Sequence, residues 1–276
     1  MLFRSLNFSH VIDRIANQIM VWPYCREDQR RLTPILLEGP PGVGKSYFCE
    51  ELAKVLGIPY KRIDCAAVTG AMALTGSTSH WGNAQPGIIL ETAVNSDSAN
   101  NMWFLDEINH ASQESKSPVM PVLLGMLEPQ TAQYLRDDYC GIEFDVSRNI
   151  FIAACNDTRS MPSALISRFE RFTIASPNSQ QRKIVAKRLF EQTFIAFAID
   201  DEALNLVARL DLGLRELRRV MTQCGERLVM ELRRSGHDTP SSVANRPVVR
   251  ELHVREIIRA NRYRLLPVAE VEFDRA

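Results

Sequence analysis

The residues with the clearest chemical capacity form one glycine-rich segment, Gly39-Pro40-Pro41-Gly42-Val43-Gly44-Lys45-Ser46. It matches the pattern GxxxxGK[ST] and lies between an apolar run, Ile35–Leu37, and a helical pattern over Tyr47–Leu56, which is the strand–loop–helix context that this motif requires. Glycines let the backbone curl so that several N–H groups converge on one anion, and a helix N-terminus adds partial positive charge there. The segment therefore predicts a phosphate site, in which Lys45 contacts the terminal phosphates and Ser46 ligates Mg²⁺.

A pair of carboxylates follows a second apolar run, Met102–Leu105, as Asp106-Glu107. A carboxylate at the C-terminal end of a buried strand, beside a phosphate loop, is where an acidic side chain supports Mg²⁺. The adjacent Glu107 is placed to polarise a water for attack on the γ-phosphate. The alternative is an acidic pair that caps the next helix, but the phosphate motif upstream favours the catalytic interpretation.

Three single polar residues complete the candidate site. Asn156 follows the run Phe151–Cys155 and is placed to orient the attacking water, although Asn-Asp is also common in turns. Arg168 is a candidate to neutralise transition-state charge on a neighbouring subunit's nucleotide. Arg215 is a candidate to contact the phosphates of its own subunit, and the alternative for either arginine is a solvated side chain.

The elements that must position these residues begin with short apolar runs separated by helical patterns. Runs this short and this apolar fit strands that are buried on both faces, and their spacing leaves room for crossover helices. The pattern predicts an α/β fold with a central parallel sheet flanked by helices. The runs are Ile35–Leu37, Tyr60–Ile63, Met102–Leu105, Ile150–Ala154 and Phe172–Ile174.

Beyond Ser176 the pattern becomes helical, and basic side chains, which are outnumbered by acidic ones before this point, become the more numerous. We expect an α/β nucleotide-binding domain over residues 1–176, a small all-helical lid domain over 177–265 and a C-terminal tail over 266–276. The predicted helices run from a cap at Ser179 to about Phe197, from Asp200 or Asp201, from Gly213 to Arg234 and from Val249 to Asn261.

Charge balance, cysteine spacing and the length of the apolar runs exclude several classes of protein. The 276 residues carry 33 basic and 33 acidic side chains, so there is no general attraction to nucleic acid or to anionic lipid. The six cysteines include no CxxC pair, which indicates reduced thiols and a cytoplasmic protein. No apolar run approaches the roughly 18 residues of a membrane span, and Arg4 interrupts the N-terminus too early for a signal peptide.

Taken together, these residues resemble the AAA+ ATPases, and most closely the ATPase module of the Lon protease family. The resemblance implies ATP and Mg²⁺ as cofactors, Lys45 and Ser46 in the Walker A motif, and Asp106 and Glu107 in the Walker B motif. It further implies Asn156 as sensor 1, Arg168 as the arginine finger with Arg171 as its competitor, and Arg215 as sensor 2. It extends from about His10 to Leu265 and includes Thr75–Ile89, Phe104–Ile108, Leu124–Pro129 and a hairpin around Tyr139–Asp145.

The resemblance also implies a homo-oligomeric ring, usually of six subunits, whose pore loops pull on a polypeptide. Trp81 falls where that family carries its pore-loop aromatic, and the alternative is an aromatic packed on a helical surface. Gly82 departs from the aliphatic residue usual at the next position.

The peptidase domain that the Lon family places after the lid has no counterpart in this sequence, so we expect no peptidase activity. The leading hypothesis is a ring-forming protein remodeller or unfoldase that acts on a protein substrate, directly or through an adaptor. The alternatives are a nucleotide-dependent switch or scaffold and a DNA-directed ATPase, against which the zero net charge argues.

Overall fold

The computed structural model describes residues 6–78, 82–98, 100–111, 118–235 and 246–266. The chain divides into two compact units, Met1–Ala175 and Ser176–Ala276. The change of composition in the sequence lies at this division.

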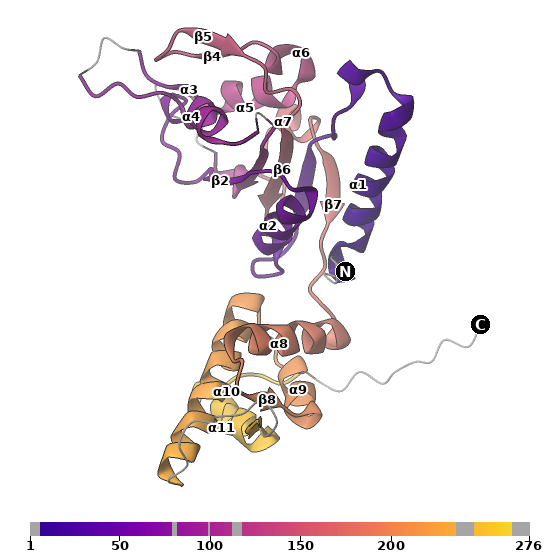
Figure 1. The fold of residues 1–276 in the computed structure, drawn as a ribbon, viewed down its shortest axis with the longest axis vertical. Coiled ribbons are helices and arrows are strands. Elements are labelled where there is room, and N and C mark those ends of the chain that lie inside the picture. Colours follow the sequence, from indigo (N-terminus) through magenta and orange to yellow (C-terminus); the bar gives the residue numbers. More distant parts are fainter. Residues whose placement is uncertain (1–5, 79–81, 99, 112–117, 236–245, 267–276) are drawn as a thin grey trace. The chain divides into compact units, whose positions relative to one another are not determined.

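The first unit is built on a parallel five-stranded sheet with the strand order β2-β3-β6-β1-β7 (Figure 1). The predicted α/β fold with a central parallel sheet is confirmed. The last strand begins earlier than its apolar run, because it pairs with β1 from Glu170, while Ile174 follows the strand. The strands are β1 (Ile35–Glu38), β2 (Tyr60–Asp64), β3 (Met102–Asp106), β6 (Ile150–Cys155) and β7 (Glu170–Thr173).

Alternate side chains of the central strands enter two separate cores, one on each face of the sheet. Leu36, Trp103 and Phe151 belong to one core. Their strand neighbours Ile35 and Phe104 belong to the other core. Because side chains alternate between the faces of a strand, continuous apolar runs are required when helices cover both faces.

Helices cover both faces of the sheet, and a small hairpin adjoins them (Figure 1). Residues of α1 and α2 contribute to the core with Ile35, and residues of α4, α5 and α7 contribute to the core with Leu36. The described elements are α1 (Ser9–Val21), α2 (Lys45–Leu56), α3 (Met72–Thr75), α4 (Ile88–Asn95), α5 (Val119–Leu127), α6 (Pro129–Ala132), α7 (Ser163–Ile166), and the antiparallel strands β4 (Leu135–Asp137) and β5 (Ile142–Phe144).

The second unit packs its helices around a core of its own, with a short pair of strands that the sequence pattern did not predict. Buried residues of this core include Phe190, Leu204, Val220 and Ile257. The elements are α8 (Ser179–Thr193), β8 (Ala198–Ile199), α9 (Asp201–Ala208), α10 (Leu214–Arg234), β9 (Val248–Val249) and α11 (Glu251–Asn261).

Two predicted boundaries in this unit are wrong for a local reason. The cap of α8 is Asn178, whose side chain accepts from the Gln181 amide at 2.9 Å while the Gln181 side chain accepts from the Asn178 amide. This reciprocal capping box makes Ser179 the first helical residue and not the cap. At the other end of the unit, Val249 pairs in β9, so that α11 begins only at Glu251.

The six cysteines differ in their exposure. Cys140, in the turn between β4 and β5, is exposed, whereas Cys49, Cys65, Cys155 and Cys224 are buried. Burial raises the pKa of Cys65 and of Cys224 to about 12. Within the described residues, no helix combines the length and the apolar character that crossing a membrane requires.

Candidate functional site

Three neighbouring strands bring the candidate residues to one edge of the sheet. β6 lies between β3 and β1, and all three strands are parallel, so their carboxyl ends meet at the same edge. Asp106 ends β3, Asn156 follows β6 and the segment Gly39–Gly44 follows β1. The structure thus brings together the candidates that the sequence had suggested for phosphate, metal and water.

The glycine-rich segment turns sharply before α2. Gly44 caps this helix in the left-handed region, at φ 99°, where a residue with a side chain would be strained. Gly44 has no side chain that could accept from the backbone N–H groups of the first turn, and no side-chain cap of this helix is found among the described residues. α2 begins at Lys45, two residues earlier than predicted, which places both Lys45 and Ser46 in this first turn.

The Lys45 ammonium lies against the same loop. Its Nζ donates to the carbonyl oxygen of Gly39 at 2.6 Å and to that of Pro40 at 3.2 Å. Burial lowers the pKa of Lys45, because desolvation disfavours its charged form. Among the described residues no carboxylate forms an ion pair with it, so the loop holds a partly desolvated cation that a phosphate would neutralise.

Asp106 is the buried carboxylate of this edge. Its Oδ2 lies 2.7 Å from Nη2 of Arg62 on β2, and its Oδ1 accepts from the backbone N–H of Glu107 at 3.1 Å. Sequence reasoning missed Arg62, because nothing in its own strand marks a charged partner for Asp106.

Glu107 has an exposed side chain and an unusual backbone. Its φ of 52° and ψ of 41° lie in the left-handed region, which is uncommon for a residue other than glycine. Strained backbone of this kind concentrates at functional sites. Here it turns the chain immediately after β3, so that Asp106 and Glu107 project from a bend and not along a continuing strand.

Asn156 is exposed and follows Cys155 directly. The Cys155 carbonyl oxygen accepts from the Gly39 N–H at 3.2 Å, which ties the end of β6 to the start of the glycine-rich loop. The Cys155 thiol has its pKa raised to about 11, chiefly by burial.

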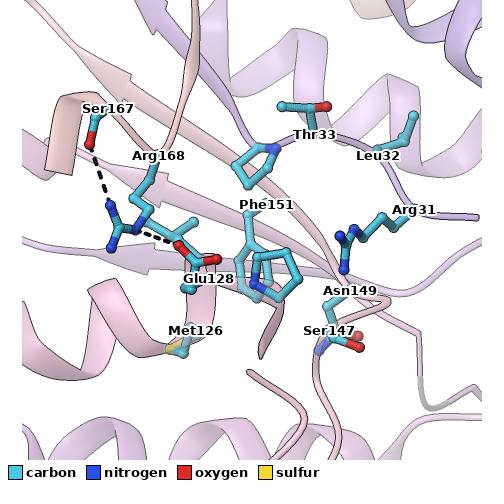
Figure 2. Close-up of a pocket in the computed structure, with 13 residues that line it drawn as sticks. Arg31, Leu32, Thr33, Met126, Glu128, Ser147, Asn149, Phe151, Ser167 and Arg168 are labelled. Carbon is cyan, nitrogen blue, oxygen red and sulfur yellow. Dashed lines mark hydrogen bonds and ion pairs between the residues drawn. The ribbon is translucent and has the colours of Figure 1, made fainter. Parts of the chain in front are cut away.

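Arg168 lies at the opposite edge of the sheet, before the amino end of β7 (Figure 2). It lines a pocket of about 290 Å³ with residues that precede β1 and β6, among them Thr33 and Asn149. Its Nε lies 3.1 Å from Oε2 of Glu128, and its Nη1 donates to the Ser167 hydroxyl at 3.4 Å. The whole length of the strands separates Arg168 from the glycine-rich loop of its own subunit. Glu128 is a partner that the sequence did not indicate.

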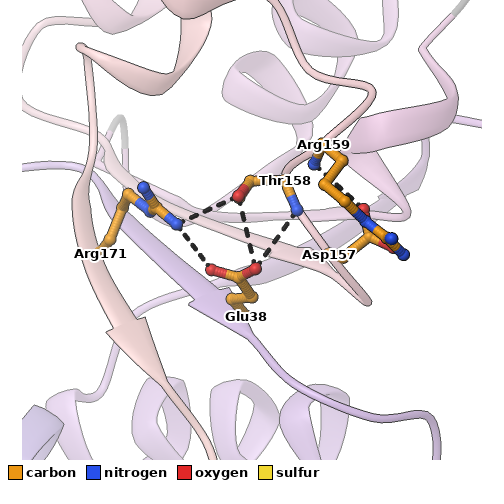
Figure 3. Close-up of polar contacts among 5 residues, drawn as sticks. All are labelled: Glu38, Asp157, Thr158, Arg159 and Arg171. Carbon is orange, nitrogen blue, oxygen red and sulfur yellow. Dashed lines mark hydrogen bonds and ion pairs between the residues drawn. The ribbon is translucent and has the colours of Figure 1, made fainter.

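Arg171, the competitor of Arg168, extends toward the other edge. It pairs in register with Leu36, and its Nη2 donates to Oε2 of Glu38 at 2.9 Å and to the Thr158 hydroxyl at 3.0 Å (Figure 3). It is therefore engaged beside the glycine-rich loop of its own subunit.

The structure does not relate two of the candidates to this edge. Arg215 is exposed in the first turn of α10, in the second unit, and is described only within that unit. Trp81, the pore-loop candidate, lies outside the described residues.

Gly39 provides a sharp steric test of this geometry. A Cβ built on Gly39 would lie 2.4 Å from the Ile174 carbonyl oxygen, which is backbone that follows β7. We expect Gly39→Ala to destabilise the first unit by roughly 1–3 kcal/mol, as overpacking does, measured by denaturant unfolding.

Gly125, inside α5, is the matched control, because a Cβ there meets nothing within 4 Å. Gly125→Ala should stabilise the protein by up to about 1 kcal/mol through helix propensity. Equal effects of the two substitutions would contradict the close approach at Gly39.

Comparison with known proteins gives the family. The model of the ATPase family associated with various cellular activities (AAA) matches residues 35–176, slightly more than half of the chain. The Lon protease of Mycoplasma genitalium is 25% identical over 249 residues, which cover 85% of this chain and 31% of the relative. The Lon protease of Brucella suis is 28% identical over 211 residues, which cover 72% of this chain and 26% of the relative.

The chain thus spans about a third or less of the length of these curated relatives. Among solved structures, a RuvB mutant of Thermotoga maritima is similar in fold, with a TM-score of 0.64 and 15% identity over 94% of this chain and 71% of that chain. The predicted resemblance to the AAA+ ATPases and to Lon proteins is confirmed at the level of the ATPase module. The chain belongs to the AAA family of ATPases.

Proposed function

We propose that this chain binds ATP with Mg²⁺ at the carboxyl edge of its sheet, hydrolyses it, and uses the energy to remodel other proteins as part of a ring. The observation that carries the nucleotide site is the partly desolvated ammonium of Lys45 beside a helix N-terminus whose cap residue, Gly44, has no side chain. Both features favour a polyanion, and the triphosphate of a nucleotide supplies one.

The donor set at this edge also fits Mg²⁺, which is usually held by one or two protein oxygens together with phosphates. The Ser46 hydroxyl and the Asp106 carboxylate are the residues that would hold it. When bound, Mg²⁺ supplies charge that neutralises the β- and γ-phosphate oxygens. Nη2 of Arg62 lies 2.7 Å from Oδ2 of Asp106 and thereby orients that carboxylate.

Phosphate binding and activation of the attacking water are assigned to separate residues. Lys45 leaves the Gly39 and Pro40 carbonyls for the phosphates, and Glu107 accepts a proton from the attacking water. Asn156, exposed between the ends of β3 and β1, orients that water with its amide. We assign Arg215 to the phosphates of the same subunit on the strength of the family resemblance alone.

The geometry favours Arg168 over Arg171 as the arginine that acts on a neighbouring subunit. Arg171 is held by Glu38 near its own nucleotide loop, whereas Arg168 lies at the far edge, where it can serve only another subunit's nucleotide. This arrangement supports a closed ring, which we propose to contain six copies by resemblance to the family. Glu128 then holds Arg168 in place within its own subunit.

We propose a protein substrate or an adaptor as the partner, because the curated relatives are named proteases. A nucleotide-dependent switch or scaffold remains the alternative, and a DNA-directed ATPase is disfavoured by the balanced charge of 33 basic and 33 acidic residues. The six free thiols support a cytoplasmic location.

The nucleotide site is tested by comparing two lysines of α2. Lys45→Ala should weaken ATP binding by roughly tenfold or more, because a hydrogen bond to a charged group contributes about 1.5–3 kcal/mol. Lys54→Ala removes an exposed lysine that pairs with Glu50 and Glu51, and it should leave binding unchanged. Titration of a fluorescent ATP analogue with Mg²⁺ measures both variants. Equal affinity of the two would contradict the site.

The remodelling activity is tested with Glu107→Gln, which keeps the shape of the side chain and removes the base. We expect ATP binding to persist while turnover falls by about 10²–10⁴-fold, the typical contribution of a general base. In ATP this variant should retain a protein substrate in a pull-down, with the Lys45→Ala variant as the negative control. Slow turnover in the unaltered protein, with nothing retained by Glu107→Gln, would favour the switch or scaffold.

The role of Arg168 is tested by mixing inactive subunits. Arg168→Ala and Lys45→Ala subunits should each be inactive alone but recover partial ATPase activity in mixed rings, because some interfaces then join an intact loop to an intact arginine. Arg171→Ala in place of Arg168→Ala should give no such recovery, because Arg171 is held beside its own subunit's loop. Rings shown to be mixed that regain no activity with Arg168→Ala would overturn the assignment.

A further inference from the structure

A cluster of polar side chains beside the nucleotide loop has no part in the roles assigned above (Figure 3). Glu38 is the last residue of β1 and immediately precedes Gly39. Its carboxylate accepts three hydrogen bonds, from the Thr158 N–H at 3.3 Å, from the Thr158 hydroxyl at 3.4 Å and from Arg171 at 2.9 Å. Arg171 closes the cluster, because the same Nη2 also donates to the Thr158 hydroxyl at 3.0 Å.

A carboxylate at this position carries an electrostatic cost for a protein that binds a triphosphate. Like charges repel strongly where solvent screening is incomplete, and the Glu38 side chain is only 21% exposed. Arg171 offsets that charge, and its bond also fixes the direction of the carboxylate. We therefore expect the carboxylate to serve a structural purpose whose benefit outweighs this repulsion.

The geometry of the loop after β6 indicates that purpose. Cys155, at the end of β6, is tied to the nucleotide loop through its carbonyl oxygen, which accepts from the Gly39 N–H at 3.2 Å. Three residues later, Thr158 is tied to the same place through both of its hydrogen bonds to Glu38. Asn156 lies between Cys155 and Thr158 in the chain and makes none of these hydrogen bonds itself.

We propose that Glu38 and Thr158, held by Arg171, are positioning residues that fix Asn156 relative to the phosphate loop. This inference rests on the proposed ATPase function. It predicts that loss of Glu38 impairs ATP hydrolysis more than it impairs nucleotide binding. A displacement of about 1 Å at a catalytic group can cost on the order of a hundredfold in rate.

A second ion pair on the same loop supplies a control. Asp157 and Arg159 lie 3.0 Å apart, but their side chains are 45% and 88% exposed, and they contact neither Glu38 nor Arg171 in the described interactions (Figure 3). Exposed pairs of this kind contribute little. Arg159→Ala therefore removes an arginine from the same neighbourhood without touching the cluster.

The experiment measures kcat for ATP hydrolysis and, separately, the equilibrium affinity for a fluorescent ATP analogue in the full chain. Glu38→Ala and Thr158→Val should each lower kcat by about tenfold or more without weakening the affinity. Thr158→Ser should restore kcat, because it keeps the hydroxyl, and Arg159→Ala should match the unaltered protein in both measurements.

The decisive comparison introduces Glu38→Ala into an Asn156→Ala background. Because Glu38 is inferred to act through Asn156, Glu38→Ala should cause no further loss of kcat in the Asn156→Ala background. If the two residues acted independently, the fold-losses in kcat of the two substitutions would multiply. A full additional loss, or a fall in affinity that matches the fall in kcat, overturns the inference. Failure of the unaltered protein to bind or hydrolyse ATP is a different result, which refutes the proposed function itself.

A separate experiment tests whether Arg171 neutralises the charge of the Glu38 carboxylate. Arg171→Ala should weaken ATP binding, because the Glu38 carboxylate is then no longer neutralised, and adding Glu38→Gln should restore the affinity. If Arg171→Ala binds ATP as tightly as Arg159→Ala does, the neutralising role of Arg171 is wrong.

Discussion

The candidate site depends on the parallel register of β3, β6 and β1. Leu105 pairs with Ala153 across β3 and β6, and Leu37 pairs with Ala154 across β1 and β6. Because these strands run in one direction and end at the same level, the residues that follow them meet without any long-range loop having to fold back. A slip of one residue in any of the three would exchange the two faces of that strand and send each of its side chains into the core on the opposite face.

The sequence was sufficient for the fold class and for the nucleotide loop because both rest on local patterns. Continuous apolar runs report strands that are covered on both faces, and the eight residues Gly39–Ser46 carry their own loop geometry. The ends of the helices and strands were predicted less accurately. The cap of α8 is an example: Asn178 is followed three residues later by Gln181, as a capping box requires, whereas Ser179 is followed by Arg182, and this spacing was overlooked.

The side-chain partnerships could not be predicted, because each joins residues that lie far apart in the chain. Glu38 and Arg171, for example, are 133 positions apart. Only the pairing of β1 with β7 brings them together. The same strand contains Arg171 but begins after Arg168, the candidate that the sequence preferred over Arg171. The left-handed backbone of Glu107 is likewise a product of the turn after β3 and has no marker in the sequence.

The distribution of thiols has a practical consequence. Cys140 is exposed in the turn of the β4–β5 hairpin, and burial shields Cys49, Cys65, Cys155 and Cys224, with Cys25 intermediate. Thiolates are the reactive form, so the raised pKa of the buried groups slows their alkylation further. With Cys25 replaced by serine, a maleimide dye would label the hairpin selectively and report its movements by fluorescence without a newly introduced cysteine.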